Sequence, residues 1–361
     1  MAMSLGRAKN GYVLYHVAFT GLKRENLTED FLFTYDGKKA PNLDFAIEHN
    51  WTGKRFMDSG EFPAHKKGIR LNHEDYIDYV NKYGKYLDAC CCMDYIPRDT
   101  DGPDYMKISA EVTFRDYIYQ RSLIEDPATR DKFIYIIHIE DAANLLPRAL
   151  EYRDDLGLPI RYLGAGLSIS NNELRIRQGA LYNEILAKYK YDGNVHGFGL
   201  QTAAVIQKLP ILTSSDSSSA VREQASGLLY YKGERVKIAE DTKAHHKGQF
   251  TDAQYKVIEP EIRAYAEQLG IDYDLARTNA AERYLFNCRA RSQHIKELAA
   301  DESVPPAKVM EQRGLLAFAQ KKPQTDWRQA LTYSPELEAE IRARMNPRAV
   351  EYWETHKHLF Q

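Results

Sequence analysis

Several side chains that could carry chemistry stand at the ends of short apolar runs. Asp58 follows KRFM, Asp94 follows a run with three consecutive cysteines, and Asp216 closes ILTSS. Glu140 ends FIYIIHI, and His196 lies within NVHGFGL. Carboxylates that converge on one site raise each other's proton affinity, which lets one donate a proton while another stays ionised. These residues therefore predict nucleophilic and acid–base chemistry, although any single Asp could equally be the N-cap of a following helix.

Such a site requires elements that bring the ends of the apolar runs together. From residue 12 to about 219, short apolar runs alternate with amphipathic stretches of helical period, which is typical of parallel βα units. Strands are expected at residues 12–19, 54–58, 86–94, 133–140, 160–168, 194–200 and 211–216, with an eighth at 228–233. Helices are expected at residues 73–84, 114–126, 141–157 and 173–189. This order predicts an α/β fold, a (β/α)8 TIM barrel, whose active site forms at the carboxyl ends of the strands.

The last third of the chain has a different character. Beyond about residue 251 the strand signals stop, and charged helical sequence continues to the C-terminus. We therefore expect a barrel catalytic domain at residues 1–250 and a helical extension packed on it at residues 251–361.

Composition restricts the environment and the partners of the protein. Hydrophobic residues make up 43% and charged residues 28%, and no apolar run approaches the roughly 20 residues that span a bilayer, so no membrane segment is expected. Four cysteines, three of them consecutive, do not form a disulfide framework, which favours the cytoplasm. The net charge of −2 provides no general basic field, so a polyanion would need a local patch of cations.

Two of the acidic positions lie in open turns. In MDSGEF, Ser59 and Gly60 predict a tight turn that leaves Asp58 pointing into the barrel mouth and brings Phe62 over it. In SSDSSS, Asp216 is flanked by small hydroxyl residues and is accessible to a large substrate, although the serines can also cap the next helix.

These motifs resemble those of the tRNA-guanine transglycosylase superfamily, and most of all its DpdA-type DNA-guanine transglycosylases of phages and bacteria. The sequence DSGEF at residues 58–62 is similar to the family's DSGGF-like turn, in which the Asp is the acid/base and the aromatic ring stacks on the base. HGFG, which begins at His196, precedes Asp216 by the interval that separates the family's corresponding strand from its nucleophilic Asp. The similarity covers residues 12–233.

The resemblance implies an enzyme that exchanges guanine in DNA for a 7-deazaguanine, such as 7-cyano-7-deazaguanine, without a cofactor. Asp216 would be the covalent nucleophile and Asp58 the proton-transfer partner. The implied base-binding residues are Phe62, Asp94, Glu140, Gly166, Leu167 and His196, with Glu140 standing where the family has Gln. Family barrels commonly pair, which implies a homodimer.

The zinc motif of the tRNA enzymes, CxCxxC with a later His, is missing from the sequence. A structural metal is therefore not expected, and the DNA-acting branch is favoured over the tRNA-acting one. Cations for the phosphates are predicted among the basic residues after the barrel, or else these form a solvated helix surface: Lys243, Lys247, Arg283, Arg289 and Arg291.

Three alternatives remain open. One is a tRNA-guanine transglycosylase. Another is a metal-dependent barrel hydrolase, because metal-ligand types stand at the strand ends: Asp58, His138, Glu140, His196 and Asp216. The third is a nucleic-acid-binding module with no catalysis, for which Asp216→Ala would keep the full biological effect.

Overall fold

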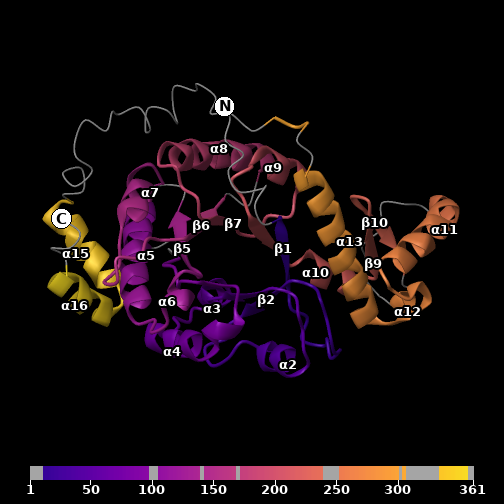
Figure 1. Cartoon of the computed structure of the whole chain (residues 1–361), viewed down its shortest axis with the longest axis horizontal. Coiled ribbons are helices and arrows are strands. Elements are labelled where there is room, and N and C mark those ends of the chain that lie inside the picture. Colours follow the sequence, from indigo (N-terminus) through magenta and orange to yellow (C-terminus); the bar gives the residue numbers. More distant parts are fainter. Residues whose placement is uncertain are drawn as a thin grey trace.

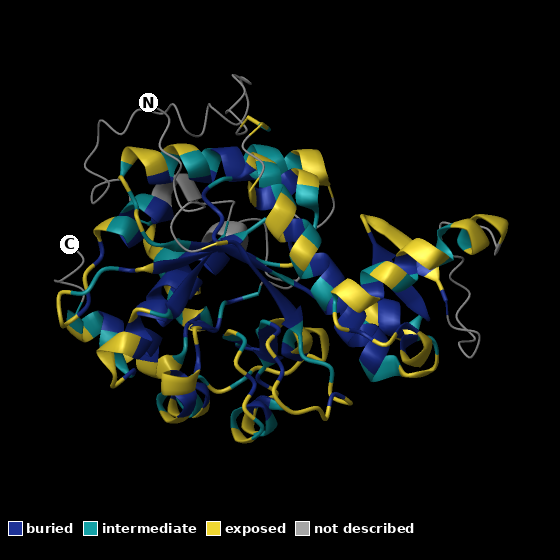
Figure 2. Cartoon of the chain, turned by 45° about the vertical axis from the view of Figure 1, so that its right-hand side comes forward, coloured by how far each residue is buried: buried dark blue, intermediate teal, exposed yellow. Residues whose placement is uncertain are grey.

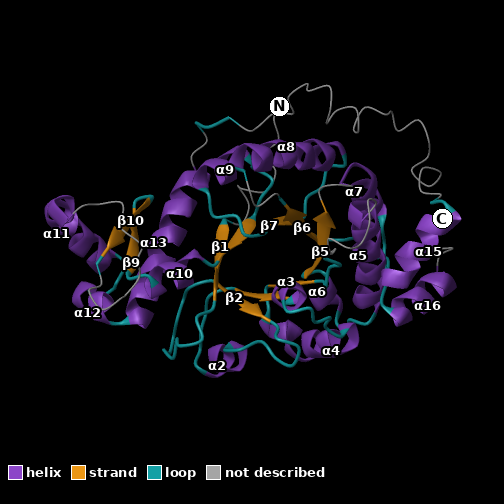
Figure 3. Cartoon of the chain, turned by 180° about the vertical axis from the view of Figure 1, so that it is seen from behind, coloured by secondary structure: helices purple, strands orange, loops and turns teal. Residues whose placement is uncertain are grey.

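The computed structural model describes residues 11–96, 105–138, 142–167, 171–238, 252–300, 303–305 and 333–356. In this part of the chain eight parallel strands pair in sequence order, and β8 pairs with β1, which closes a barrel (Figure 1, Figure 3). The strands are β1 (Val13–Val17), β2 (Phe31–Thr34), β3 (Arg55–Asp58), β4 (Ala89–Cys91), β5 (Phe133–His138), β6 (Tyr162–Gly166), β7 (Asn194–Gly197) and β8 (Ser214–Ser217). The predicted (β/α)8 barrel is confirmed.

The strands are short and mostly buried, because helices cover the outside of the barrel and side chains fill its interior. β5, with the sequence FIYIIH, is buried until its last residue, and all three residues of β4 are buried. The register aligns Tyr15 with Asp216 and Thr34 with Asp58. The carboxyl ends of β3 and β8 therefore open at the same mouth of the barrel.

Helices follow each strand from β2 to β8, whereas the described residues 18–30 between β1 and β2 form no helix (Figure 3). Asn72 and Asn171 begin α4 and α8 by accepting hydrogen bonds from first-turn amides. The elements are α2 (Leu43–Glu48), α3 (Glu61–Lys66), α4 (His73–Tyr83), the 3-10 turn η1 (Gly84–Tyr86), α5 (Tyr105–Ser122), α6 (Pro127–Arg130), α7 (Ala142–Glu151), α8 (Asn172–Lys188), α9 (Ala203–Lys208) and α10 (Ser219–Ala225).

A second, small sheet follows the barrel. β9 (Leu228–Tyr231) and β10 (Glu234–Lys237) form an antiparallel pair, and α11 (Asp252–Gln268), α12 (Tyr273–Thr278) and α13 (Ala280–Ala300) accompany it. The hairpin, α11 and α12 project from one side of the barrel (Figure 1, Figure 2). The prediction of an eighth barrel strand at residues 228–233 is wrong, because this segment is β9; the strand that the sequence reading missed is β2.

The long helix α13 joins this small sheet to the barrel. The Tyr284 hydroxyl donates to the carbonyl oxygen of Val17 at 2.8 Å, and the His16 Nε2 lies 2.9 Å from the Ser292 Oγ. Both contacts reach β1, so α13 covers the barrel beside α10 and completes its outer layer.

The last described helices, α15 (Pro335–Arg344) and α16 (Pro347–His356), pack against α5 on another side of the barrel (Figure 1, yellow). Arg115 donates to both carboxylate oxygens of Glu338, at 2.7 and 2.8 Å, and its guanidinium lies 4.5 Å from the centre of the Trp353 ring. Among the described residues, no helix combines the length and the apolar character needed to cross a bilayer.

Candidate active site

Three of the predicted acidic residues meet at the carboxyl mouth of the barrel. Asp58 is the last residue of β3, Asp216 lies in β8, and Asp94 follows β4. The charges of Asp216 and Asp94 both raise the pKa of Asp58, which places the three carboxylates within electrostatic reach of one another. The structure therefore brings together the residues that the sequence predicted as nucleophile, proton-transfer partner and base-edge acceptor.

Asp58 is held by the turn that follows it. Gly60 has a φ of 77°, and a Cβ at this position would lie 1.9 Å from the carbonyl oxygen of Tyr35, so only glycine fits without a shift of the backbone. The backbone amides of Ser59 and Gly60 donate to the Asp58 carboxylate. Burial, and then the charge of Asp216, outweigh these hydrogen bonds and raise the pKa of Asp58 to about 7. Asp58 can therefore exist in either protonation state near neutral pH.

Asp216 has a more polar environment. One of its oxygens, Oδ1, accepts a hydrogen bond from the backbone amide of Gly199 at 2.7 Å and one from the His196 Nε2 at 3.2 Å. The Asp216 side chain retains 15% of its exposure, whereas that of His196 is fully buried. Because both donors reach Oδ1, the other oxygen, Oδ2, is the one presented for a reaction.

A chain of hydrogen bonds inside the barrel fixes the orientation of His196. Its Nδ1 lies 3.0 Å from the Ser214 Oγ, which lies 2.8 Å from the Tyr162 hydroxyl. Since the Asp216 carboxylate can only accept, Nε2 must carry the ring proton, and Nδ1 then accepts from Ser214. Phe56 and Phe198 pack on the ring, with centroid distances of 4.5 and 4.8 Å.

Asp94 is positioned by α5, which holds the peptide groups on either side of it. Gln120 accepts from the Met93 amide at 2.8 Å and donates to the Met93 carbonyl at 3.1 Å. Thr113 Oγ1 accepts from the Tyr95 amide at 2.9 Å, and His138 Nε2 lies 3.1 Å from the same oxygen. Burial raises the pKa of Asp94 to about 6.

His138 is one of the residues that hold the peptide groups next to Asp94. Burial lowers the pKa of His138 to about 4, so the imidazole is neutral near pH 7 and orders the Asp94 loop through hydrogen bonds. These contacts do not support the alternative in which His138 is a metal ligand. Within the described residues, no group of three or more His, Cys, Asp or Glu side chains is arranged to hold a metal ion.

Three further predicted base-binding residues, Phe62, Gly166 and Leu167, lie at or directly after the carboxyl ends of β3 and β6. Phe62, in the first turn of α3, is 51% exposed, and the Lys66 Nζ lies 4.1 Å from the centre of its ring. Gly166 ends β6, and Leu167 is half-buried directly after it. A Cβ on Gly166 would lie 3.0 Å from the Ile137 carbonyl oxygen, so the glycine permits close strand packing. Glu140 lies outside the described residues.

The prediction for the phosphate-binding arginines needs correction. Arg283 is 2% exposed and donates to the carbonyl oxygens of Gln224, Ala276 and Arg277. Arg291 is 5% exposed and pairs with Glu223, 3.0 Å away. These guanidinium groups bind α13 to residues of α10 and α12, so they do not face a nucleic acid.

Arg289 is also engaged within the protein. It pairs with Glu29 and donates to the Leu269 carbonyl, both at hydrogen-bond distance. It connects α13 to the segment before β2 and to the end of α11. Lys243 and Lys247, the other two predicted phosphate ligands, lie outside the described residues.

The contact between His196 and Asp216 is the feature of the site that the sequence analysis does not predict. There His196 is a base-binding residue or, in the hydrolase alternative, a metal ligand, whereas in the structure its imidazole contacts Asp216. A signal did exist: residues two apart on a strand point to the same face, so Ser214 and Asp216 both face the barrel interior. The register places His196 opposite Ser214.

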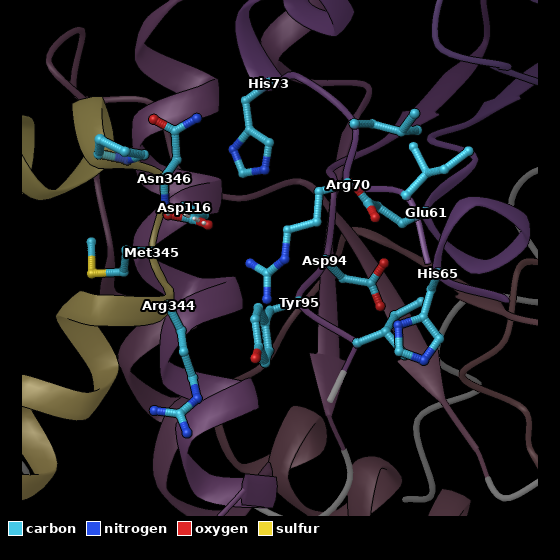
Figure 4. A pocket seen from close by; sticks show the side chains of 14 residues that line it. Glu61, His65, Arg70, His73, Asp94, Tyr95, Asp116, Arg344, Met345 and Asn346 are labelled. Carbon is cyan, nitrogen blue, oxygen red and sulfur yellow. Dashed lines mark hydrogen bonds between the residues drawn. The ribbon is translucent and has the colours of Figure 1, made fainter. Parts of the chain in front are cut away.

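A cavity of about 180 Å³ lies beside Asp94, between α3, α5 and the turn that joins α15 to α16 (Figure 4). Asp94 and Glu61 line one side of it, Asp116 lies on the other, and Arg70 reaches between them over the Tyr95 ring. Burial raises the pKa of Glu61 to about 7 and that of Asp116 to about 8. The cavity therefore extends the polar mouth away from Asp58 and towards the C-terminal helices.

Comparison of the sequence with protein-family models and with curated proteins gives no match. Fold and site together define a (β/α)8 barrel with an acidic mouth, in which the pKa of Asp58 is raised to about 7 and Asp216 accepts two hydrogen bonds on a single oxygen.

Proposed function

We propose that the protein is a transglycosylase that replaces guanine in DNA with a 7-deazaguanine through a covalent Asp216–sugar intermediate. The observation that supports this most is the contrast between Asp58, whose pKa is raised to about 7, and Asp216, whose Oδ1 holds two N–H donors. Pairs of carboxylates with separated proton affinities are the arrangement that nucleophilic and acid–base displacement at a sugar carbon requires.

In the first step, Oδ2 of Asp216 attacks C1′ of the target guanosine. The C1′–O bond forms as the C1′–N9 bond breaks, and the departing guanine takes the proton of Asp58. The amide of Gly199 and the Nε2 of His196 keep Oδ1 fixed, so the attacking oxygen needs no reorientation. The products are a glycosyl ester on Asp216, neutral guanine and an ionised Asp58.

In the second step, the 7-deazaguanine enters the place that guanine has left. Asp58 accepts the proton from its ring nitrogen, that nitrogen attacks C1′, and the bond to Asp216 breaks. Two inversions at C1′ give overall retention, and Asp58 is again protonated for the next turnover.

The target base must leave the duplex to reach Asp58 and Asp216, which lie inside the mouth. Phe62 is exposed beside this site and offers a face for stacking, and the Gly166–Leu167 backbone offers polar groups to the base edge. Asp94, with a pKa of about 6, is largely ionised above neutral pH and accepts from the N–H groups that guanine and 7-deazaguanine share.

The test is to trap the covalent adduct. The protein is incubated with guanine-labelled double-stranded DNA, and separately with tRNA, and each reaction is denatured with and without 7-cyano-7-deazaguanine. We expect an adduct with DNA in the wild type, none in Asp216→Ala, and release of guanine that requires Asp58. Circular dichroism of each variant controls for folding.

The outcomes separate the alternatives. An adduct with tRNA alone would replace the DNA assignment with the tRNA reaction. An adduct that survives Asp216→Ala would refute the nucleophile. Hydrolysis without an adduct, abolished by a chelator, would favour the metal-dependent hydrolase instead.

A further inference from the structure

The segment at residues 61–70, EFPAHKKGIR, forms one wall of the barrel mouth, and we call it the mouth segment. It starts directly after the turn that holds Asp58 and consists of α3 and the turn that ends it. Within that turn the Gly68 amide donates to the His65 carbonyl at 2.9 Å and the Ile69 amide to the Ala64 carbonyl at 3.0 Å. With Gly68 at a φ of 70°, these bonds make a Schellman motif, so the turn has a fixed shape.

The mouth segment exposes apolar side chains in this fixed turn. Phe62 is 51% and Ile69 50% exposed, and they are two of the large hydrophobic residues that the described chain leaves in solvent. In a Schellman motif the residue at the Ile69 position commonly packs on the helix five or six residues earlier. Here these positions hold Ala64 and Pro63, which leave Ile69 exposed.

Cations surround these apolar side chains. Lys66, Lys67 and Arg70 stand in the segment against the single carboxylate of Glu61. Lys66 lies over the Phe62 ring, 4.1 Å from its centre. The local positive charge is notable because the chain as a whole carries −2 and the mouth itself is lined by carboxylates.

The mouth segment lies where the phosphates beside a target nucleotide would pass. A nucleotide that enters the mouth remains bonded to its neighbours, so the flanking phosphates must lie on the rim beside Asp58. An acidic mouth repels those phosphates unless the rim supplies cations. Arg283 and Arg291 are buried elsewhere, whereas the mouth segment begins three residues after Asp58 and exposes both lysines.

We propose that the mouth segment is a DNA-binding wedge. Lys66 and Lys67 hold the phosphates on either side of the target nucleotide, and Ile69 packs against the base step from which that nucleotide has left. Apolar side chains inserted at unstacked steps serve this purpose in proteins that distort DNA. DNA as the occupant rests on the proposed function, but the wedge is tested by binding alone, without turnover.

The binding test uses a fluorescein-labelled 20-base-pair duplex and anisotropy over a range of salt concentrations. Lys66→Ala/Lys67→Ala should lower the slope of log K against log salt by about 2 and weaken binding by about 10- to 100-fold near 0.1 M salt. The matched control is Lys82→Ala/Lys85→Ala, which removes two exposed lysines that also lie over aromatic rings, at 4.8 and 4.9 Å. These lie before β4, at the opposite end of the barrel, and should leave both quantities unchanged.

The wedge itself is tested with 2-aminopurine placed beside the target guanine. Wild-type binding should raise its fluorescence as the step unstacks, and Ile69→Ser should remove that rise while the salt slope stays the same. Both measurements are made with all variants carrying Asp216→Asn, so that covalent adduct formation does not contribute to the signal.

Equal salt slopes in the Lys66/Lys67 variant and the wild type would overturn the proposal, as would a larger loss in the control variant. Absence of DNA binding by the wild type, or a stronger dependence on these lysines for tRNA than for DNA, would overturn it as well. DNA binding that depends on the mouth segment, together with no covalent adduct in the wild type, would leave the wedge standing and refute the transglycosylase.

Discussion

Replacing Asp58 with Asn should stabilise the protein at alkaline pH while it abolishes turnover. The pKa of Asp58 rises from 3.8 to about 7 on folding, mainly because the carboxylate is buried and secondly because Asp216 lies near it. The folded state therefore binds the proton more tightly than the unfolded state. Stability from this group is complete below pH 3.8 and is lost as the pH rises towards 7.

The difference between the unfolded and folded pKa values of Asp58 sets the size of this change in stability. Each pH unit between the two pKa values costs the folded state about 1.4 kcal/mol, so the ionised Asp58 costs about 4 kcal/mol in total. Between pH 5 and pH 8 the cost grows by about 3 kcal/mol, which corresponds to about 5 °C in Tm for a chain of this length. Asn does not titrate and avoids this cost.

The assay compares the Tm of the wild type and Asp58→Asn at pH 5 and pH 8 by differential scanning calorimetry. The difference in favour of the variant should increase by about 5 °C over this interval. Asp126→Asn is the control, because the pKa of Asp126 is lowered by its hydrogen bond with Thr129 and its contribution does not change above pH 5. A constant difference for Asp58→Asn across the interval would refute the reasoning that this carboxyl is protonated near neutral pH.

Three further changes test the site and its supports. His196→Phe, which suits the aromatic surroundings but cannot donate to Asp216, should slow adduct formation in single-turnover kinetics by about 10- to 100-fold and leave DNA affinity unchanged. Gly60→Ala should lower the Tm clearly more than Gly68→Ala, because both have positive φ but only a Cβ at Gly60 meets a carbonyl, at 1.9 Å. Arg291→Met should destabilise the protein by about 3 kcal/mol in denaturant unfolding, since Glu223 loses a buried partner, and DNA affinity of the folded variant should not change.

The carboxylates of the mouth could be predicted from the sequence because one rule decides their position. Asp58 and Asp216 terminate or nearly terminate buried apolar runs, and in a parallel barrel the carboxyl ends of all strands open on the same side. To predict that these two carboxylates converge, it was therefore enough to assign the two strands correctly. The order of the strands between them did not matter.

The errors arose where short segments gave a weak or ambiguous signal. β2 has four residues, FLFT, of which three are apolar, and follows a polar stretch without alternation, whereas all four residues of β9, LLYY, are apolar. The longer apolar run therefore favoured residues 228–233 over residues 31–34 as a barrel strand. Pairing decides the matter in the structure, because β9 pairs only with β10 among the described strands, and β8 closes on β1.

The arginines of α13 show why charge in a sequence does not locate a binding surface. Arg283 and Arg291 look like a basic stripe on a charged helix, but the helix is sandwiched between the barrel and the small sheet. Carbonyl groups and Glu223 satisfy these guanidinium groups. Which face of a helix is covered depends on tertiary contacts, and the sequence of α13 does not contain that information.

The contrast between Asp58 and Asp216 can be traced to the strands that carry them. Asp216 lies two residues after Ser214 on the same face of β8, so a chain from Tyr162 through Ser214 and His196 reaches it from inside the barrel. Asp58 ends its strand, the backbone amides of Ser59 and Gly60 in its own turn donate to it, and desolvation disfavours its charge. The two aspartates therefore differ in their surroundings: N–H donors from two other parts of the barrel mouth reach Asp216, whereas desolvation raises the pKa of Asp58 to about 7.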